Sequence, residues 1–128
     1  MINKKEERIK SFLFNFLLII NVPLNQNSGK KSYIIRAIGR NPGGDHNKFE
    51  IYLEADRRLP ITVTVNGTKY DKYGSPVGSF SGFISAGENT GSVIHSGNSG
   101  DRGKVARYAG TCSPSSSNGG LYTYTFIG

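Results

Sequence analysis

The sequence predicts an all-β protein, an antiparallel β-sandwich of about seven strands that follows an N-terminal hydrophobic segment. Short stretches of alternating apolar and polar residues recur throughout 30–128. Clusters of Gly, Asn, Ser, Pro and Asp separate them, and the chain holds 17 Gly and 5 Pro. No stretch after residue 30 has the period of an amphipathic helix, so a parallel sheet with crossover helices is not expected. A small antiparallel barrel fits the same number of strands.

The first 29 residues differ chemically from the rest of the chain. Residues 1–10 are charged and basic on balance, 11–24 are almost all apolar, and 25–31 are polar. This order is typical of a secretory signal peptide. An uncleaved anchor and a buried helix are the alternatives, although the apolar run at 12–22 is shorter than the roughly 20 residues that span a bilayer. We therefore expect a signal peptide or membrane anchor at 1–29 and one domain at 30–128.

Each expected strand rests on its own pattern. Phe49, Ile51 and Leu53 alternate with polar neighbours, and β-branched residues alternate with polar ones over 61–66. Such a pattern indicates a strand with one buried and one solvated face. Asn66-Gly67 then predicts a tight turn, because both residues tolerate a positive φ. The seven expected strands are 33–40, 49–54, 61–66, 77–85, 91–95, 104–111 and 121–127.

One stretch carries a family resemblance. Residues 49–94 contain an alternating strand, an LP corner, a second strand and the segment SGFISAGENTGSV. This arrangement resembles bacterial extracellular immunoglobulin-like modules of the Calx-beta and fibronectin III-like group. In the pattern I-x-A-G-x-x-x-G-x-V, the resemblance implies a hairpin between neighbouring strands that turns at Ala86-Gly87, with Ile84 and Val93 in the same core. The acidic residues that hold calcium in Calx-beta modules are not recognisable as a set.

The sequence offers little catalytic or metal-binding chemistry. Cys112 is the only cysteine, and we expect it to be a small buried side chain rather than a nucleophile. The two histidines, His46 and His95, are far apart in the sequence, so a standard zinc spacing is absent. Asp45 beside His46 is better explained as part of a polar turn than as a calcium loop. The sequence therefore predicts no enzyme, no metal and no cofactor.

Charge and aromatic content suggest possible ligands. The net charge is +7, but the basic residues are scattered, and we expect no nucleic-acid partner. Sugars stack on exposed aromatic rings, and the chain has seven Tyr and no Trp. The candidate ligand-binding residues are Tyr70, Tyr73, Tyr122 and Tyr124.

These observations favour a secreted or surface-associated, non-catalytic binding or structural module at a bacterial cell surface. We expect it to act in adhesion or extracellular assembly, through a protein partner or self-assembly at exposed sheet edges. The alternative is a carbohydrate-binding module that uses exposed Tyr residues to hold a polysaccharide. Membrane contact is expected only through an uncleaved N-terminal segment.

Overall fold

A computed structural model describes residues 29–128 of the chain, and 32–128 form one compact unit. The signal peptide or anchor predicted for 1–29 lies outside the described residues, apart from Gly29. Within the described part, no helix is both long enough and apolar enough to cross a membrane.

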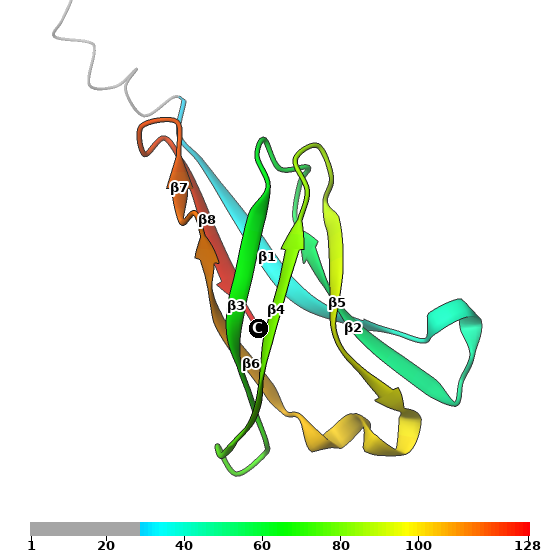
Figure 1. The fold of residues 1–128 in the computed structure, drawn as a ribbon. Coiled ribbons are helices and arrows are strands. Elements are labelled where there is room, and N and C mark those ends of the chain that lie inside the picture. The colour runs from blue at the N-terminus through cyan, green and yellow to red at the C-terminus, as the bar shows by residue number, and fades with distance from the viewer. Residues whose placement is uncertain (1–28) are drawn as a thin grey trace, which may run out of the picture. The chain divides into compact units, whose positions relative to one another are not determined.

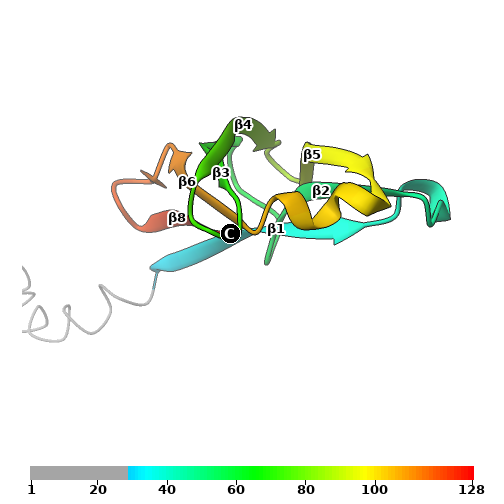
Figure 2. The ribbon, with the colours of Figure 1, turned by 90° about the horizontal axis from the view of Figure 1, so that it is seen from below.

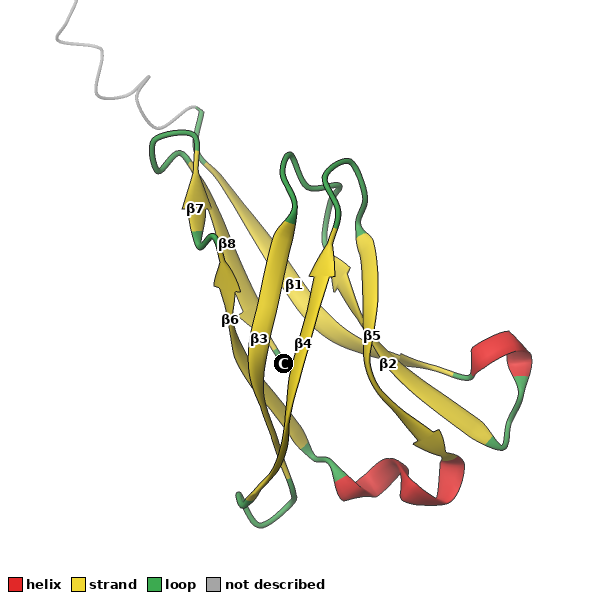
Figure 3. Cartoon of the chain, viewed as in Figure 1, coloured by secondary structure: helices red, strands yellow, loops and turns green. Residues whose placement is uncertain are grey.

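The described chain is built mostly of strands (Figure 3). Two short 3-10 helices, η1 (Pro42–Gly44) and η2 (Ser99–Lys104), interrupt them. The strands are β1 (Lys31–Arg40), β2 (Lys48–Ala55), β3 (Val63–Tyr70), β4 (Pro76–Ile84), β5 (Thr90–Asn98), β6 (Arg107–Ser113), β7 (Ser116–Ser117) and β8 (Tyr122–Ile127). All seven expected strands are present in the structure, and β7 is an additional two-residue strand. The strand expected at 104–111 begins later, because Lys104 is the last residue of η2.

The strands form two sheets, which Figure 2 shows as two layers. One sheet has the order β5-β2-β1-β8-β7, and the other has the order β4-β3-β6 (Figure 1). Every strand pair with a defined register is antiparallel, including β1 with β2 and β3 with both β4 and β6. The fold is therefore an all-β, two-sheet sandwich, as the sequence predicts.

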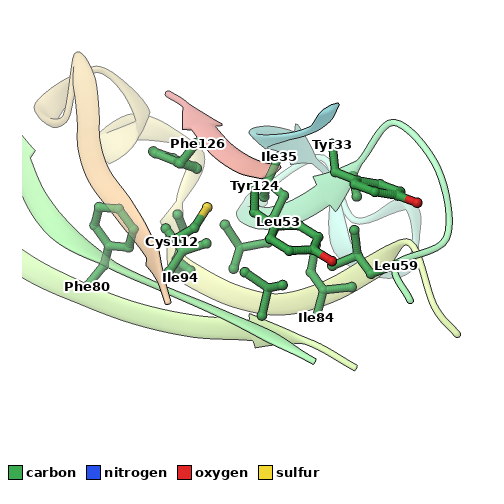
Figure 4. Packing of buried hydrophobic residues seen from close by; sticks show 13 residues of the cluster. Tyr33, Ile35, Leu53, Leu59, Phe80, Ile84, Ile94, Cys112, Tyr124 and Phe126 are labelled. Atoms are coloured by element: carbon green, nitrogen blue, oxygen red, sulfur yellow. The ribbon is translucent and has the colours of Figure 1, made fainter. Parts of the chain in front are cut away.

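Apolar side chains from the facing sides of both sheets fill the space between the layers (Figure 4). The alternation in the sequence explains this directly, because successive side chains of a strand point to opposite faces. Val63 and Val65 of β3 are fully buried, as is Leu53 of β2. Aromatic rings complete the core at the β8 side, where the Tyr33 and Tyr124 rings stack with centroids 5.3 Å apart.

The turn predicted at Asn66-Gly67 is wrong. Both residues lie in the middle of β3, where Gly67 is opposite Phe80 of β4 and Gly110 of β6. A Cβ at Gly67 would overlap the Ala109 carbonyl oxygen and come within 2.7 Å of the Phe80 ring. Gly67 is thus required for close packing rather than for a turn. The chain reverses instead after β3, where Gly74 has a φ of 83°.

The expected hairpin between β4 and β5 is only partly correct. Gly87 has a φ of 84°, and the Glu88 amide donates to the Ser85 carbonyl, so the chain does turn there. However, β4 and β5 belong to different sheets. Ile84 is fully buried, but Val93 is 41% exposed and its neighbour Ile94 takes the core position. The pairing of β2 with β5 shifts register on both sides of Tyr52, and this irregularity changes which side chain of β5 faces inward.

Candidate binding site at the edge of β4

Strand β4 lies at one edge of its sheet, with β3 as its only neighbour in the strand order. At the end of β4, the Phe83 amide donates to the Ser92 hydroxyl oxygen at 2.9 Å, and that hydroxyl donates to the Phe83 carbonyl at 3.1 Å. The backbone groups of Phe83 therefore point away from β3, toward the edge. The Ser92 side chain occupies the place that a neighbouring strand would otherwise take.

Backbone groups of alternate residues point to the same edge of a strand. Ser79, Ser81 and Phe83 are alternate residues of β4, and the β3–β4 register is regular from Ile84 to Gly78. The amides and carbonyls of Ser79 and Ser81 therefore point outward, as those of Phe83 do. Within the described residues, no hydrogen bond occupies these outward groups of Ser79 and Ser81. An edge of this kind can pair with another extended chain.

The exposed side chains of β4 are unusually apolar for a strand at the surface. Val77 and Phe83 are each 50% exposed, one near each end of the strand. Between them stand Ser79 and Ser81, which are small, uncharged and exposed. No charged residue protects β4 over 77–83, although edge strands commonly carry such protection. The register with β3 is irregular at Val77, where Gly78 lies opposite Lys69 and Pro76 opposite Tyr70, and is regular from Gly78 to Ile84.

A cleft of about 620 Å³ opens beside this edge, between the β3–β4 turn and η2. Figure 1 shows the turn and η2 at the same end of the sandwich. The cleft is lined by basic and apolar side chains, which include Lys69, Lys72, Tyr73, Val77, His95 and Lys104. Because Val77 belongs both to the cleft and to β4, the two features form one continuous site.

Lys69 reaches this cleft from an inward-facing position of β3. It follows Val63, Val65 and Gly67 on the same face, at the end of the apolar core. Gly78 lies opposite Lys69 in β4, and a Cβ at Gly78 would lie 3.2 Å from the Lys69 Cε. The missing side chain leaves room for the lysine stem, which extends along β4 toward His95 of β5.

The Lys69 Nζ lies 3.3 Å from the His95 Nδ1. An ammonium group can only donate, so Nδ1 accepts this hydrogen bond and the neutral imidazole carries its proton on Nε2. Burial lowers the pKa of His95, and the positive charge of Lys69 lowers it further. The imidazole also packs against Phe49 and Tyr108, with ring centroids 5.4 and 6.3 Å away. At neutral pH the cleft is thus lined by the positively charged Lys69 and the neutral imidazole of His95.

The carboxylates near the cleft are already engaged. Asp71 Oδ1 accepts hydrogen bonds from the amides of Tyr73 and Ser75, which fixes the β3–β4 turn. Asp101 forms an ion pair with Lys104 at 3.0 Å. No ion pair involves Lys69 or Lys72 within the described residues. The cleft is therefore cationic, with donors available to an anion.

Tyr70 and Tyr73, which are neighbouring candidates in the sequence, differ in how far their rings are exposed. Tyr73 lies at the cleft, is 80% exposed and has the Lys72 Nζ 5.3 Å from its ring centroid. Tyr70 is half-buried at the end of β3, and the guanidinium of Arg107 covers its ring at 4.2 Å. Only Tyr73 offers an open ring face near the cleft.

Tyr122 and Tyr124 belong to β8, which is in the other sheet from β3 and β4, and neither lines the cleft. Tyr124 is only 3% exposed, stacks on Tyr33 and forms a 2.8 Å hydrogen bond with Ser117 through its hydroxyl. Tyr122 is half-buried and meets Tyr33 edge-on, with ring centroids 6.0 Å apart. Tyr124 is a core residue in this structure, and its ring presents no face to a ligand.

The remaining candidates lie away from this site. Cys112 is buried in the core of the sandwich, as expected, and burial raises its pKa to about 11. The described residues contain no group of three or more His, Cys, Asp or Glu side chains placed to hold a metal ion.

Sequence reasoning missed Lys69, Val77 and His95 as parts of one site. A signal was present for Lys69, because it occupies an inward position in the alternation that begins at Val63. The convergence of β3, β4 and β5 at one end of the sandwich depends on the sheet order, which no local pattern reveals. Comparison of the chain with protein-family models, curated proteins and solved structures found no significant match.

Proposed function

We propose that this chain is a non-catalytic binding module that takes up an extended segment of a partner protein along the open edge of β4. The observation that carries the proposal is the row of outward backbone groups at Ser79 and Ser81, next to exposed Val77. In strand addition, main-chain hydrogen bonds supply affinity and adjacent pockets supply specificity. The cleft beside β4 is such a pocket.

A proline substitution tests this function. Ser79→Pro removes the outward amide of Ser79 and places a ring where an added strand would lie, and edge strands tolerate proline at such positions. Ser79→Ala is the matched control, because it keeps the amide. Peptides selected from a random decapeptide library on the wild-type protein serve as probes.

We expect these peptides to bind the wild-type protein and Ser79→Ala with the same Kd, and Ser79→Pro about tenfold more weakly, since one or two hydrogen bonds are lost. Circular dichroism of Ser79→Pro establishes that the fold is retained. Equal binding to all three proteins, or a library that yields no binding peptide, contradicts strand addition.

Self-assembly is a specific form of this proposal, in which the added strand comes from a second copy. It predicts oligomers or fibres of the purified protein that Ser79→Pro abolishes. Strictly monomeric behaviour in sedimentation at high protein concentration would exclude self-assembly and leave a different protein as the partner.

Carbohydrate binding is the second candidate, and the openly exposed ring of Tyr73 favours it. A sugar ring could stack on Tyr73 while Lys72 contacts its polar groups. In this case Tyr73→Ala abolishes retention on an insoluble glycan, whereas Tyr122→Ala has no effect. Failure of the wild-type protein to bind any member of a broad glycan panel would exclude this function.

We also propose that the module acts outside the cytoplasm, at a bacterial cell surface, as an immunoglobulin-like domain released from its leader or held by an uncleaved one. The basic, apolar and polar order of residues 1–31 supports this location. The N-terminal residue and mass of the protein recovered from its native host test it. Full-length protein recovered from the cytosol is the contrary result.

A further inference from the structure

We propose that the cleft beside β4 binds a carboxylate side chain of the added segment, so that the partner presents an acidic extended peptide. This inference rests on the function proposed above and names the chemistry of the partner. Three lysines, Lys69, Lys72 and Lys104, line the cleft, against the single aspartate Asp71. Opposite charge across an interface gives specificity and speeds association.

The three lysines differ in the partners that their ammonium groups already have. Lys104 is paired with Asp101, and the Asp71 carboxylate is held by two backbone amides of the turn. Lys69 donates only to a neutral imidazole, and Lys72 only lies near the Tyr73 ring. Lys69 and Lys72 therefore retain charge that an incoming carboxylate can neutralise through charge-assisted hydrogen bonds.

The half-buried position of Lys69 makes this charge unusual. Its Cε would lie 3.2 Å from a Cβ at Gly78, and its ammonium group lies 3.3 Å from His95, whose ring packs against Phe49 and Tyr108. Charges in partly enclosed surroundings are screened less by salt than surface charges. A carboxylate at this point gains more than it would from an exposed lysine elsewhere on the protein.

The position of the cleft fits a peptide better than a free ion. Val77 lines the cleft and is part of β4, so a strand laid along Ser79 and Ser81 continues past the cleft mouth. Alternate side chains of that strand point to the same side. A segment that alternates apolar and acidic residues would thus cover Val77 and place carboxylates near Lys69 and Lys72.

The charge of the chain itself argues that the occupant is a different protein. The net charge is +7, so a second copy would bring further positive charge to a cationic cleft. The exposed residues along β4 itself include no acidic side chain that could fill this role in an exchanged strand.

A matched pair of peptides tests the inference. The probes are two labelled octapeptides, one alternating Val and Glu and the other alternating Val and Gln, measured by fluorescence anisotropy on the full-length protein. We expect the Glu peptide to bind about tenfold more tightly at an ionic strength of about 0.15 M, and this preference to shrink in high salt.

Charge variants assign the preference to the cleft. Lys72→Gln and Lys69→Gln each remove one positive charge from the cleft, whereas Lys48→Gln removes one from an exposed position in β2 outside it. We expect the first two to weaken the Glu peptide several-fold and to weaken the Gln peptide much less, because the Gln peptide carries no charge for the lysines to neutralise. Lys48→Gln should affect neither peptide.

The outcomes separate this inference from the proposed function. Equal affinity for the two peptides, with loss of both in Ser79→Pro, overturns the acidic specificity and leaves strand addition intact. Equal losses from Lys48→Gln and Lys72→Gln also overturn it, because the charge effect would not be local. If oligogalacturonate displaces the Glu peptide and binds Ser79→Pro as well as wild type, the cleft is a glycan site instead.

Discussion

Gly67 lies at the most crowded point of β3, where the backbone of β6 and the Phe80 ring leave no room for a side chain. Asn-Gly is typical of tight turns, yet here Gly67 is central in β3 because no side chain fits between Ala109 and Phe80. The local sequence could not reveal this, since the crowding comes from β6, some forty residues further along the chain.

Gly67→Ala is therefore expected to destabilise the protein by about 3 kcal/mol, the upper range for forcing extra volume into a packed region. The new Cβ would meet backbone atoms, which cannot move aside as a flexible side chain can. Urea unfolding measures the change. Gly100→Ala is the control, because nothing lies within 4 Å of its Cβ position and its φ is not positive. Equal stability of the two variants would contradict the packing described here.

The thiol of Cys112 is expected to resist alkylation in the folded protein. Burial raises its pKa to about 11, so almost none of the reactive thiolate exists at pH 8. Mass spectrometry after iodoacetamide treatment should show modification in urea but not in buffer. Rapid modification of the native protein would place Cys112 in a different environment.

His95 makes stability depend on pH. Burial and the charge of Lys69 lower its pKa in the folded state from the ordinary 6.5, so the unfolded state binds more protons between pH 6.5 and the folded-state pKa. The stabilisation is present above pH 6.5 and is lost as the pH falls through the folded-state pKa. We expect the urea midpoint to fall less between pH 7.5 and 5.5 in His95→Gln than in wild type. An identical fall in both proteins would be the contrary result.

At the scale of elements, the sequence predicts the strands well and their partners poorly. The alternation in 49–54 and 61–66 depends on burial of one face, and the structure buries Leu53, Val63 and Val65 accordingly. By contrast, the separation of β4 and β5 into different sheets is set by packing between distant segments. For the same reason, the pattern did not reveal that Val93 faces solvent.

At Phe83, the outward backbone groups of β4 are hydrogen-bonded to the Ser92 hydroxyl. Ser92→Ala removes both hydrogen bonds to Phe83, and we expect a loss of about 2 kcal/mol, since the usual net value is about 1 kcal/mol for each hydrogen bond. Hydrogen exchange at the Phe83 amide should become faster. Ser96→Ala, on the same strand, is the control and should leave that amide unchanged; equal exchange in both variants would show that Ser92 does not protect the edge.

Only part of the candidate site can be predicted from the sequence. The sequence predicts Tyr73 as a candidate ligand-binding residue, and in the structure it is exposed and lines the cleft. Tyr124 was grouped with it because two tyrosines alternate in 121–127, but alternation does not show which face is buried. Lys69 and His95 are 26 residues apart, and only the layering of the two sheets brings them together.

At the scale of the whole molecule, two layers of antiparallel strands enclose an apolar core, and the outer edge of β4 lies beside a cationic cleft. The most direct measurement of the central claim is amide hydrogen exchange of the full-length protein with and without the alternating Val and Glu octapeptide. Strand addition predicts slower exchange at Ser79 and Ser81, whose amides would become hydrogen-bonded, and no change at Thr123 of β8. Unchanged exchange at Ser79 and Ser81 in the saturated complex would contradict the account.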